Sequence, residues 1–486
     1  MTVHEAIYQK YIAPTARKAG AYVGVELEFP LVNLSRRPVD IPAVQTVVAG
    51  FAERFGFSQQ VRDDNGNLYS LTEPVTGDNL SFDCSFNTLE LSFGKEESIY
   101  ELYERFSQYI GDIQAHFRDI GHLLTGMGIH PYYKYNDSVP IANDRYRMLY
   151  HHLQSYKEYP ERHFHRLPHF GMIAAASQVQ LDVEKDSILQ TLHTMNRLEP
   201  FKAVLFANSW LDCLPDLLIS RDYLWAQSTQ GYNPHNLGMY ETDFSGLDEY
   251  IEYVAGQSMY CVGKQGRYFH FTPIPLRDYM RTAYITGQYF ADGAWRTASF
   301  RPEMEDIAHL RTFKFADLTY RGTIEYRSAC EQPMNAVFSH AAFHAGLAQE
   351  LDALTELLDT DTVLYHHGYT APELRELLTH RTLPSFIRRK ALSEKLREIL
   401  ELAQSGLQKR GFGEEAFLEP LFDRAERLTN PALDYVTALE HGTNAEELIG
   451  RYAELSSLHA GVPLTSLKLG EMELRHGCQL AHDQRR

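Results

Sequence analysis

The feature that most constrains the fold is the stretch GVELEF, which begins at Gly24 and alternates carboxylates with apolar side chains. Successive side chains of a strand point to opposite faces, so the apolar residues would face one side while Glu26 and Glu28 face the other. Glutamate is depleted in strands. Two glutamates on one short strand therefore predict a sheet whose polar face has a task beyond contact with water.

Three further segments repeat this alternation, and they are NTLELSF (87–93), SQVQLDV (177–183) and GTIEYRS (322–328). The simplest interpretation is four amphipathic strands of an antiparallel sheet with one solvated face. However, the polar positions of the four strands hold carboxylates and amides with a single arginine, Arg327. On a bare surface these carboxylates would repel one another. The pattern therefore predicts that something positively charged lies between them.

The residue types indicate what that positive partner is. Carboxylate and amide oxygens without histidine or cysteine suit Mg²⁺ or Mn²⁺ rather than zinc. Magnesium usually reaches such sites together with phosphate oxygens, which favours a nucleotide-using enzyme. Arg327 lies two residues after Glu325 on the same face, where its planar fork of donors is placed to meet a transferring phosphoryl group. The sequence contains no GxxxxGK[ST] loop and no dinucleotide-binding fingerprint.

Composition narrows the class of partner. The 486-residue chain has 64 acidic and 46 basic residues, a formal charge of −18 that argues against a nucleic-acid surface and favours a small substrate. No apolar run approaches the roughly 20 residues of a membrane helix, and the N-terminus lacks the apolar region of a secretion signal. We therefore expect a cytoplasmic protein. Five cysteines without C-x-x-C spacing are expected to be reduced thiols.

The pattern of elements divides the chain into two parts. Strand-like and helical segments are interleaved up to residue 335, which predicts an α+β catalytic core over residues 1–335. From residue 336 to the end the apolar residues recur at i, i+3 and i+4, which predicts a helical C-terminal region packed on that core. The predicted helices lie at 97–120, 186–206, 336–358, 370–380, 384–407 and 444–458.

Taken in order, these segments resemble the glutamate-cysteine ligase family and its wider group of ATP-dependent carboxylate-amine ligases. The resemblance covers roughly residues 20–345. Each piece alone is weak, but together they occur in the order of the family. The pieces are GVELEF, the D-x6-E spacing of DCSFNTLE (83–90), GIHP (128–131) followed by RYRML (145–149), SQVQLDV, LEPFKAVLFANSW (198–210), RDYLW (221–225), MYCV (259–262) with PLRDYM (275–280), and GTIEYRSACEQP (322–333).

The resemblance implies a glutamine-synthetase-like fold, in which a curved antiparallel sheet flanked by helices forms a catalytic funnel for ATP and several Mg²⁺ ions. Arg327 corresponds to the arginine of the E-x-R motif that contacts the γ-phosphate. Where relatives often carry aspartate after this motif, the present chain has Glu331. The implied metal ligands are Glu26, Glu28, Asp83, Glu90, Gln180 and Glu325, and the implied substrate-binding residues are Arg145, Tyr146, Arg221 and Trp225.

The activity implied by the resemblance is ATP-dependent formation of γ-glutamylcysteine, a step of glutathione biosynthesis, through a γ-glutamyl phosphate. Two alternatives stay open at this point. One is a ligase of the same fold that joins a different carboxylate or amine, and the other is a non-catalytic homologue that binds nucleotide or amino acid. A histidine cluster at His163, His165 and His169 is more simply explained as part of a loop than as a metal site.

Overall fold

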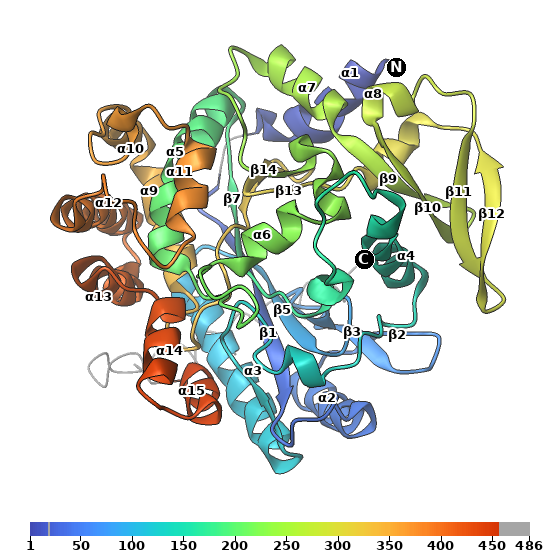
Figure 1. Cartoon of the computed structure of the whole chain (residues 1–486), viewed down its shortest axis with the longest axis horizontal. Helices are drawn as coiled ribbons and strands as arrows, with labels where there is room; N and C mark the ends of the chain where they lie inside the picture. Colours follow the sequence, from blue (N-terminus) through green and yellow to red (C-terminus); the bar gives the residue numbers. More distant parts are fainter. Residues whose placement is uncertain (18–19, 456–486) are drawn as a thin grey trace, which may run out of the picture.

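A nine-stranded antiparallel sheet lies at the centre of the protein (Figure 1). The structure is a computed structural model that describes residues 1–17 and 20–455. The strands run in the order β14-β15-β7-β1-β5-β4-β3-β2, and β6 pairs with the end of β1. Their bounds are β1 Val23–Asn33, β2 Gln59–Arg62, β3 Leu68–Thr72, β4 Asn79–Phe82, β5 Thr88–Glu96, β6 His122–Leu124, β7 Ser177–Asp182, β14 Ala316–Leu318 and β15 Thr323–Tyr326.

The alternation in the sequence sets the two faces of this sheet. Val25, Leu27 and Phe29 of β1 are at most 2% exposed and lie on the apolar face with the corresponding residues of β5, β7 and β15. The predicted α+β class with an antiparallel sheet is confirmed. Because the period of a strand is two, this burial fixes the carboxylates of all four strands on the opposite face.

Helices cover the apolar face. The helix α3 begins after Ser98, whose hydroxyl accepts a hydrogen bond from the backbone of Tyr100 and so caps the first turn. Its apolar stripe packs on the sheet, where the rings of Phe106 and Phe29 lie 5.9 Å apart. The helices before residue 300 are α1 Val3–Ile7, α2 Ile41–Phe55, α3 Ile99–Asp119, α4 Asp144–Gln154, α5 Ile188–Phe206, α6 Ser220–Ala226, α7 Leu247–Gly256 and α8 Leu276–Tyr279.

The C-terminal helices gather on one flank of the molecule (Figure 1). They are α9 Ser339–Gln349, α10 Leu351–Asp359, α11 Ala371–Leu378, α12 Arg389–Arg410, α13 Glu419–Arg427, α14 Pro431–Glu440 and α15 Ala445–Tyr452. The buried apolar side chains of α9, α10, α12 and α13, with Leu374 and Leu378 of α11, join those of the sheet in one hydrophobic cluster, so this core continues across residue 335. Most of those of α14 and α15 form a second cluster with Val32 of β1 and Leu123 of β6. The division into domains at that residue stays a prediction. The end of the predicted helix 444–458 lies outside the described residues.

The predicted helix 336–358 is wrong in one respect, because the chain breaks at Glu350 between α9 and α10. The helix α9 is buried on every side, whereas α10 buries only one face. Backbone contact explains the burial of α9: a Cβ atom built on Gly346 would lie 2.1 Å from the carbonyl oxygen of Ala403 in α12, and one on Gly406 would lie 1.9 Å from that of Gly346. Only glycine permits this approach.

A second, four-stranded antiparallel sheet lies on the flank opposite the C-terminal helices (Figure 1). Its strands are β9 Ser258–Lys264, β10 Arg267–Pro275, β11 Ile285–Ala291 and β12 Ala294–Phe300. Two short parallel strands, β8 Leu237–Gly238 and β13 Phe313–Lys314, form a separate two-stranded sheet.

No helix in the described ranges is long and apolar enough to cross a membrane. Cys84, Cys213, Cys261 and Cys330 are free thiols, as predicted, and Cys478 lies outside the described residues.

Candidate active site

The strand register brings the polar side chains of the central sheet into rows. Glu28 of β1 lies opposite Glu90 of β5, and Glu26 lies opposite Gln178 of β7. Glu325 of β15 lies opposite Gln180 of β7. Residues that are far apart in the sequence therefore share one acidic face, as the alternation predicted.

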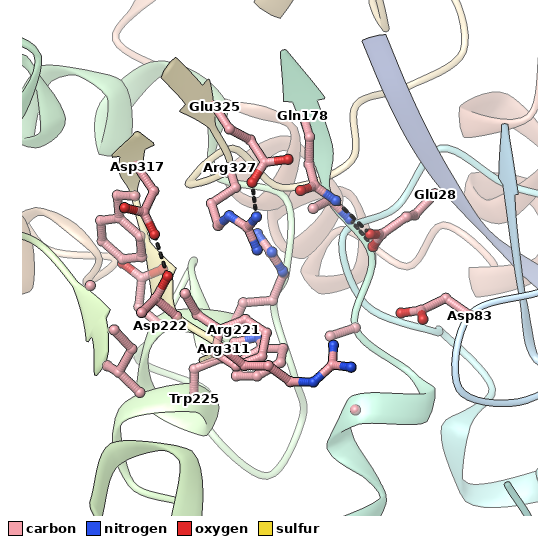
Figure 2. A pocket seen from close by; sticks show the side chains of 18 of the residues that line it. Glu28, Asp83, Gln178, Arg221, Asp222, Trp225, Arg311, Asp317, Glu325 and Arg327 are labelled. Atoms are coloured by element: carbon pink, nitrogen blue, oxygen red, sulfur yellow. Dashed lines mark hydrogen bonds and ion pairs between the residues drawn. The ribbon is translucent and has the colours of Figure 1, made fainter. Parts of the chain in front are cut away.

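This face forms one wall of a cavity of about 1790 Å³. All but one of the predicted site residues line it, and these are Glu26, Glu28, Asp83, Glu90, Arg145, Tyr146, Arg221, Trp225, Glu325 and Arg327. Figure 2 shows Arg221, Arg311 and Arg327 reaching into the space bordered by Glu325, Glu28 and Asp83.

The carboxylates of the acidic face have fewer positive charges around them than they need to stay ionised. Burial raises the pKa values of Glu26, Asp83 and Glu90. Burial together with the charge of Asp83 raises the pKa of Glu28 to about 8. A group that stays ionised under these conditions needs a positive ligand.

A divalent cation fits the chemistry of this donor set, because all of its members offer hard carboxylate oxygens. As the side chains stand, however, no three acidic, imidazole or thiol groups in the described ranges are disposed to hold a metal ion. Each acid has its own partner instead: Ser92 donates to Glu90 at 2.6 Å, Gln178 donates to Glu28 at 2.9 Å, and Arg327 forms an ion pair with Glu325. The predicted ligand set therefore stays a prediction.

Gln180 is the predicted site residue that does not line the cavity. Its amide nitrogen donates to Glu26 at 3.1 Å and to Glu325 at 2.9 Å, while its oxygen accepts from Arg321 at 3.2 Å. The amide therefore holds two carboxylates in place. Gln178, two residues earlier on the same face, lines the cavity in its stead.

Glu331 lies behind the acidic face, outside the cavity. Its carboxylate accepts from the backbone N–H of Glu28 at 2.9 Å and from the hydroxyl of Ser177 at 3.0 Å. Burial raises its pKa to about 8. The residue that stands where relatives often carry aspartate thus supports the strand that presents Glu28.

The predicted substrate-binding residues line the cavity from outside the sheet. Arg145 and Tyr146 lie in α4, and the Tyr146 hydroxyl lies 3.3 Å from Asp83. Arg221 and Trp225 lie one turn apart in α6, and the indole of Trp225 packs against Phe313 with ring centroids 4.5 Å apart. The role of these four residues toward a substrate stays a prediction.

Several cavity residues lie outside the predicted set. Asp317 alternates with the buried Ala316 and Leu318 and lies opposite Glu325, so the same alternation could have found it. Lys10, Arg311 and Arg375 also line the cavity, but no local pattern marks them. Arg375, in α11 of the helical region, is bonded to the buried Glu199 at 2.6 Å and to Asp222 at 2.8 Å.

The histidine segment does not form a metal site. The His165 ring nitrogens contact the carbonyl oxygen of Leu224 at 2.7 Å and the backbone N–H of Leu167 at 3.0 Å. Both nitrogens are therefore occupied, and a role in shaping the loop accounts for this histidine.

The sheet and its cavity together form a candidate enzyme site, with acidic side chains on one wall and arginines elsewhere in its lining. Comparison with known proteins identifies the family. The model of glutamate-cysteine ligase family 2 matches residues 22–450. The chain belongs to this family, as its motifs predicted, and is therefore a ligase.

Curated relatives agree with this assignment. The chain is 23% identical to the chloroplastic glutamate–cysteine ligase of Medicago truncatula, over 84% of its own length and 76% of the relative's. It is 22% identical to the chloroplastic glutamate–cysteine ligase of Solanum lycopersicum, over 86% of its own length and 76% of the relative's. A crystal structure of glutamate–cysteine ligase from Francisella tularensis in complex with AMP aligns with a TM-score of 0.47 and 12% identity, covering 95% of this chain and 93% of that one.

Proposed function

We propose that the protein is an ATP-dependent glutamate–cysteine ligase that forms γ-glutamylcysteine and releases ADP and phosphate. The observation that carries this proposal is the acidic face: Glu26, Glu28, Glu90 and Glu325 come from three strands, β1, β5 and β15, that are distant in the sequence, and they line one cavity together with Arg327. Membership of the family supports the reaction class.

The chemistry requires activation of a carboxylate. The γ-carboxylate oxygen of glutamate would attack the γ-phosphorus of ATP, the bond to the bridging oxygen would break, and ADP would leave with the electron pair. The amine nitrogen of the second substrate would then attack the acyl carbon, lose a proton, and expel inorganic phosphate. Such transfers are catalysed mainly by positioning and by offsetting charge on the phosphoryl oxygens.

Different residues of this chain would take different roles in this reaction. Arg327 holds its guanidinium in the cavity, and its buried Nε–H has no partner among the described residues, so the arginine can donate to a phosphoryl oxygen. Glu26, Glu28, Asp83, Glu90 and Glu325 would hold divalent cations. When bound, Mg²⁺ would neutralise these carboxylates and offset charge on the nucleotide phosphates.

The test is incubation of the protein with ATP, Mg²⁺ and L-glutamate plus a panel of amines, followed by mass spectrometry of products and an ADP assay. Cysteine-dependent ADP release supports the proposal. Release with another amine instead supports a ligase of different specificity, and ATP binding without turnover indicates a non-catalytic homologue. We expect Arg327→Ala to lower turnover by about 10²- to 10³-fold, the effect of removing one transition-state donor.

A further inference from the structure

Arg311 is an arginine of the cavity wall that the sequence motifs do not include. It lies between the 3-10 helix Met304–His309 and β13, and its backbone carbonyl accepts from the Asn236 side chain at 3.3 Å. Its side chain lines the cavity, and the buried Nε has no hydrogen-bond partner among the described residues. Buried donors are rarely left without a partner in folded proteins, so this nitrogen makes the guanidinium a candidate for binding a ligand in the cavity.

The described residues offer this guanidinium neutral groups, among them the Cys261 thiol, and the carboxylate of Asp83, which interacts with it without forming an ion pair. Arg311 lies beside Tyr260 and Cys261 of β9, and burial raises the pKa values of both side chains above their ordinary values, so both are neutral. No described carboxylate forms an ion pair with Arg311. Lys10, which also lines the cavity, adds a second positive charge nearby.

A second arginine faces the same part of the cavity. Arg145 of α4 has no ion-pair partner in the described ranges either, and both Arg145 and Arg311 act electrostatically on Asp83. Figure 2 shows the Arg311 side chain extending across the cavity toward the side on which Asp83 lies. Two arginines from separate elements therefore border one space. Arg327 lines the same cavity but differs from these two arginines in that its guanidinium is paired with Glu325.

We infer that Arg311 is a substrate-binding residue that holds an oxyanion, either the α-carboxylate of an amino-acid substrate or a phosphate of the nucleotide. Arginine suits this task because its planar fork donates two parallel hydrogen bonds to such a group. The inference rests on the proposed function, since it assigns a subsite within the same cavity.

The experiment compares Arg311→Gln and Arg311→Lys with the wild type, and Arg267→Gln serves as control. Arg267 lies on the neighbouring strand β10, donates to the carbonyl oxygen of Phe290 at 3.1 Å, and does not line the cavity. KM is measured separately for ATP, L-glutamate and L-cysteine. The two amino acids are also replaced in turn by their α-carboxamides, which lack the anionic carboxylate.

We expect Arg311→Gln to raise KM for one substrate by about 10- to 100-fold, as for loss of a charge-assisted hydrogen bond. If that substrate is an amino acid, the variant also loses the wild-type preference for its carboxylate over its carboxamide. If it is ATP, both amino-acid preferences stay intact. In either case Arg311→Lys recovers part of the affinity, and Arg267→Gln behaves as the wild type.

Unchanged KM values for all three substrates would overturn the inference. So would an equal rise for all three that Arg311→Lys does not reduce, because this indicates a structural role. Turnover by the wild type in the same assay tests the proposed function separately. If the wild type does not turn over, calorimetric titration of ATP, L-glutamate and L-cysteine into wild type and Arg311→Gln makes the same comparison by affinity.

Discussion

Replacing Glu90 by glutamine should stabilise the protein while abolishing most of its activity. Glu90 lies directly opposite Glu28, and residues so placed in an antiparallel pair have Cβ atoms roughly 5 Å apart. When both carboxylates are ionised, two like charges about 6 Å apart repel by about 3 kcal/mol at an effective dielectric constant of about 20, and this repulsion adds to the cost of keeping Glu90 ionised in the folded protein. Glu90 is half-buried, so water screens part of this repulsion. We expect a gain of about 1–2 kcal/mol in the free energy of unfolding.

The contribution of Glu90 to the free energy of unfolding depends on pH with a defined sign. Burial, and then the charges of Glu26, Asp83 and Glu28, raise the pKa of Glu90 well above its ordinary value. Folding therefore favours the protonated acid, and its contribution to stability is lost as pH rises from the ordinary glutamate pKa through the raised value. Glutamine has no proton to lose. The variant should accordingly show a smaller loss of stability over that pH range than the wild type.

The assay is differential scanning calorimetry of chelator-treated protein, supported by denaturant unfolding. At about 2 cal/mol/K of unfolding entropy per residue, a 486-residue chain that unfolds as one unit shifts its melting temperature by about 1 °C for each kcal/mol. Glu53→Gln, an exposed position on α2, serves as control and should change stability by less than about 0.5 kcal/mol.

Added Mg²⁺ should stabilise the wild type more than Glu90→Gln, since the variant has lost one proposed ligand. Turnover of Glu90→Gln should fall by about 10²- to 10³-fold. A variant that is less stable than the wild type without divalent cations, or that retains near wild-type turnover, would refute the role given to Glu90.

Three further predictions concern packing, a buried ion pair and the cation. Gly406→Ala should lower the free energy of unfolding by about 2–3 kcal/mol, because the added methyl group forces α9 and α12 apart. Gly111→Ala has open space around it and should raise the free energy of unfolding by about 0.5–1 kcal/mol. Urea unfolding measures both changes. Arg375→Met should lower the free energy of unfolding by about 3–5 kcal/mol, because it leaves Glu199 short of a partner in the core. Loss of the exposed ion pair between Arg381 and Glu440 should lower the same free energy by less than about 1 kcal/mol. A metal chelator should abolish ADP release, and Mg²⁺ or Mn²⁺ but not Ca²⁺ should restore it; recovery without a divalent cation contradicts the proposed metal role.

Local alternation along the chain is enough to assign the side chains of the polar face. Alternation with period two places Glu26, Glu28, Glu90 and Glu325 on that face whichever strands become neighbours, because the apolar residues between them must be buried. Tertiary structure decided the pairing, and with it that Gln178 faces the cavity while Gln180 joins Glu26 to Glu325.

Only the tertiary structure brought Lys10, Arg311 and Arg375 to the same cavity. They come from the N-terminal segment, from a loop before β13 and from α11, and a single charged residue in such segments carries no periodic signal. The periodic spacing of apolar residues reports on local burial, because one face of a helix or strand must be buried. The meeting of separate elements depends on how their buried faces pack, which is a property of the whole chain.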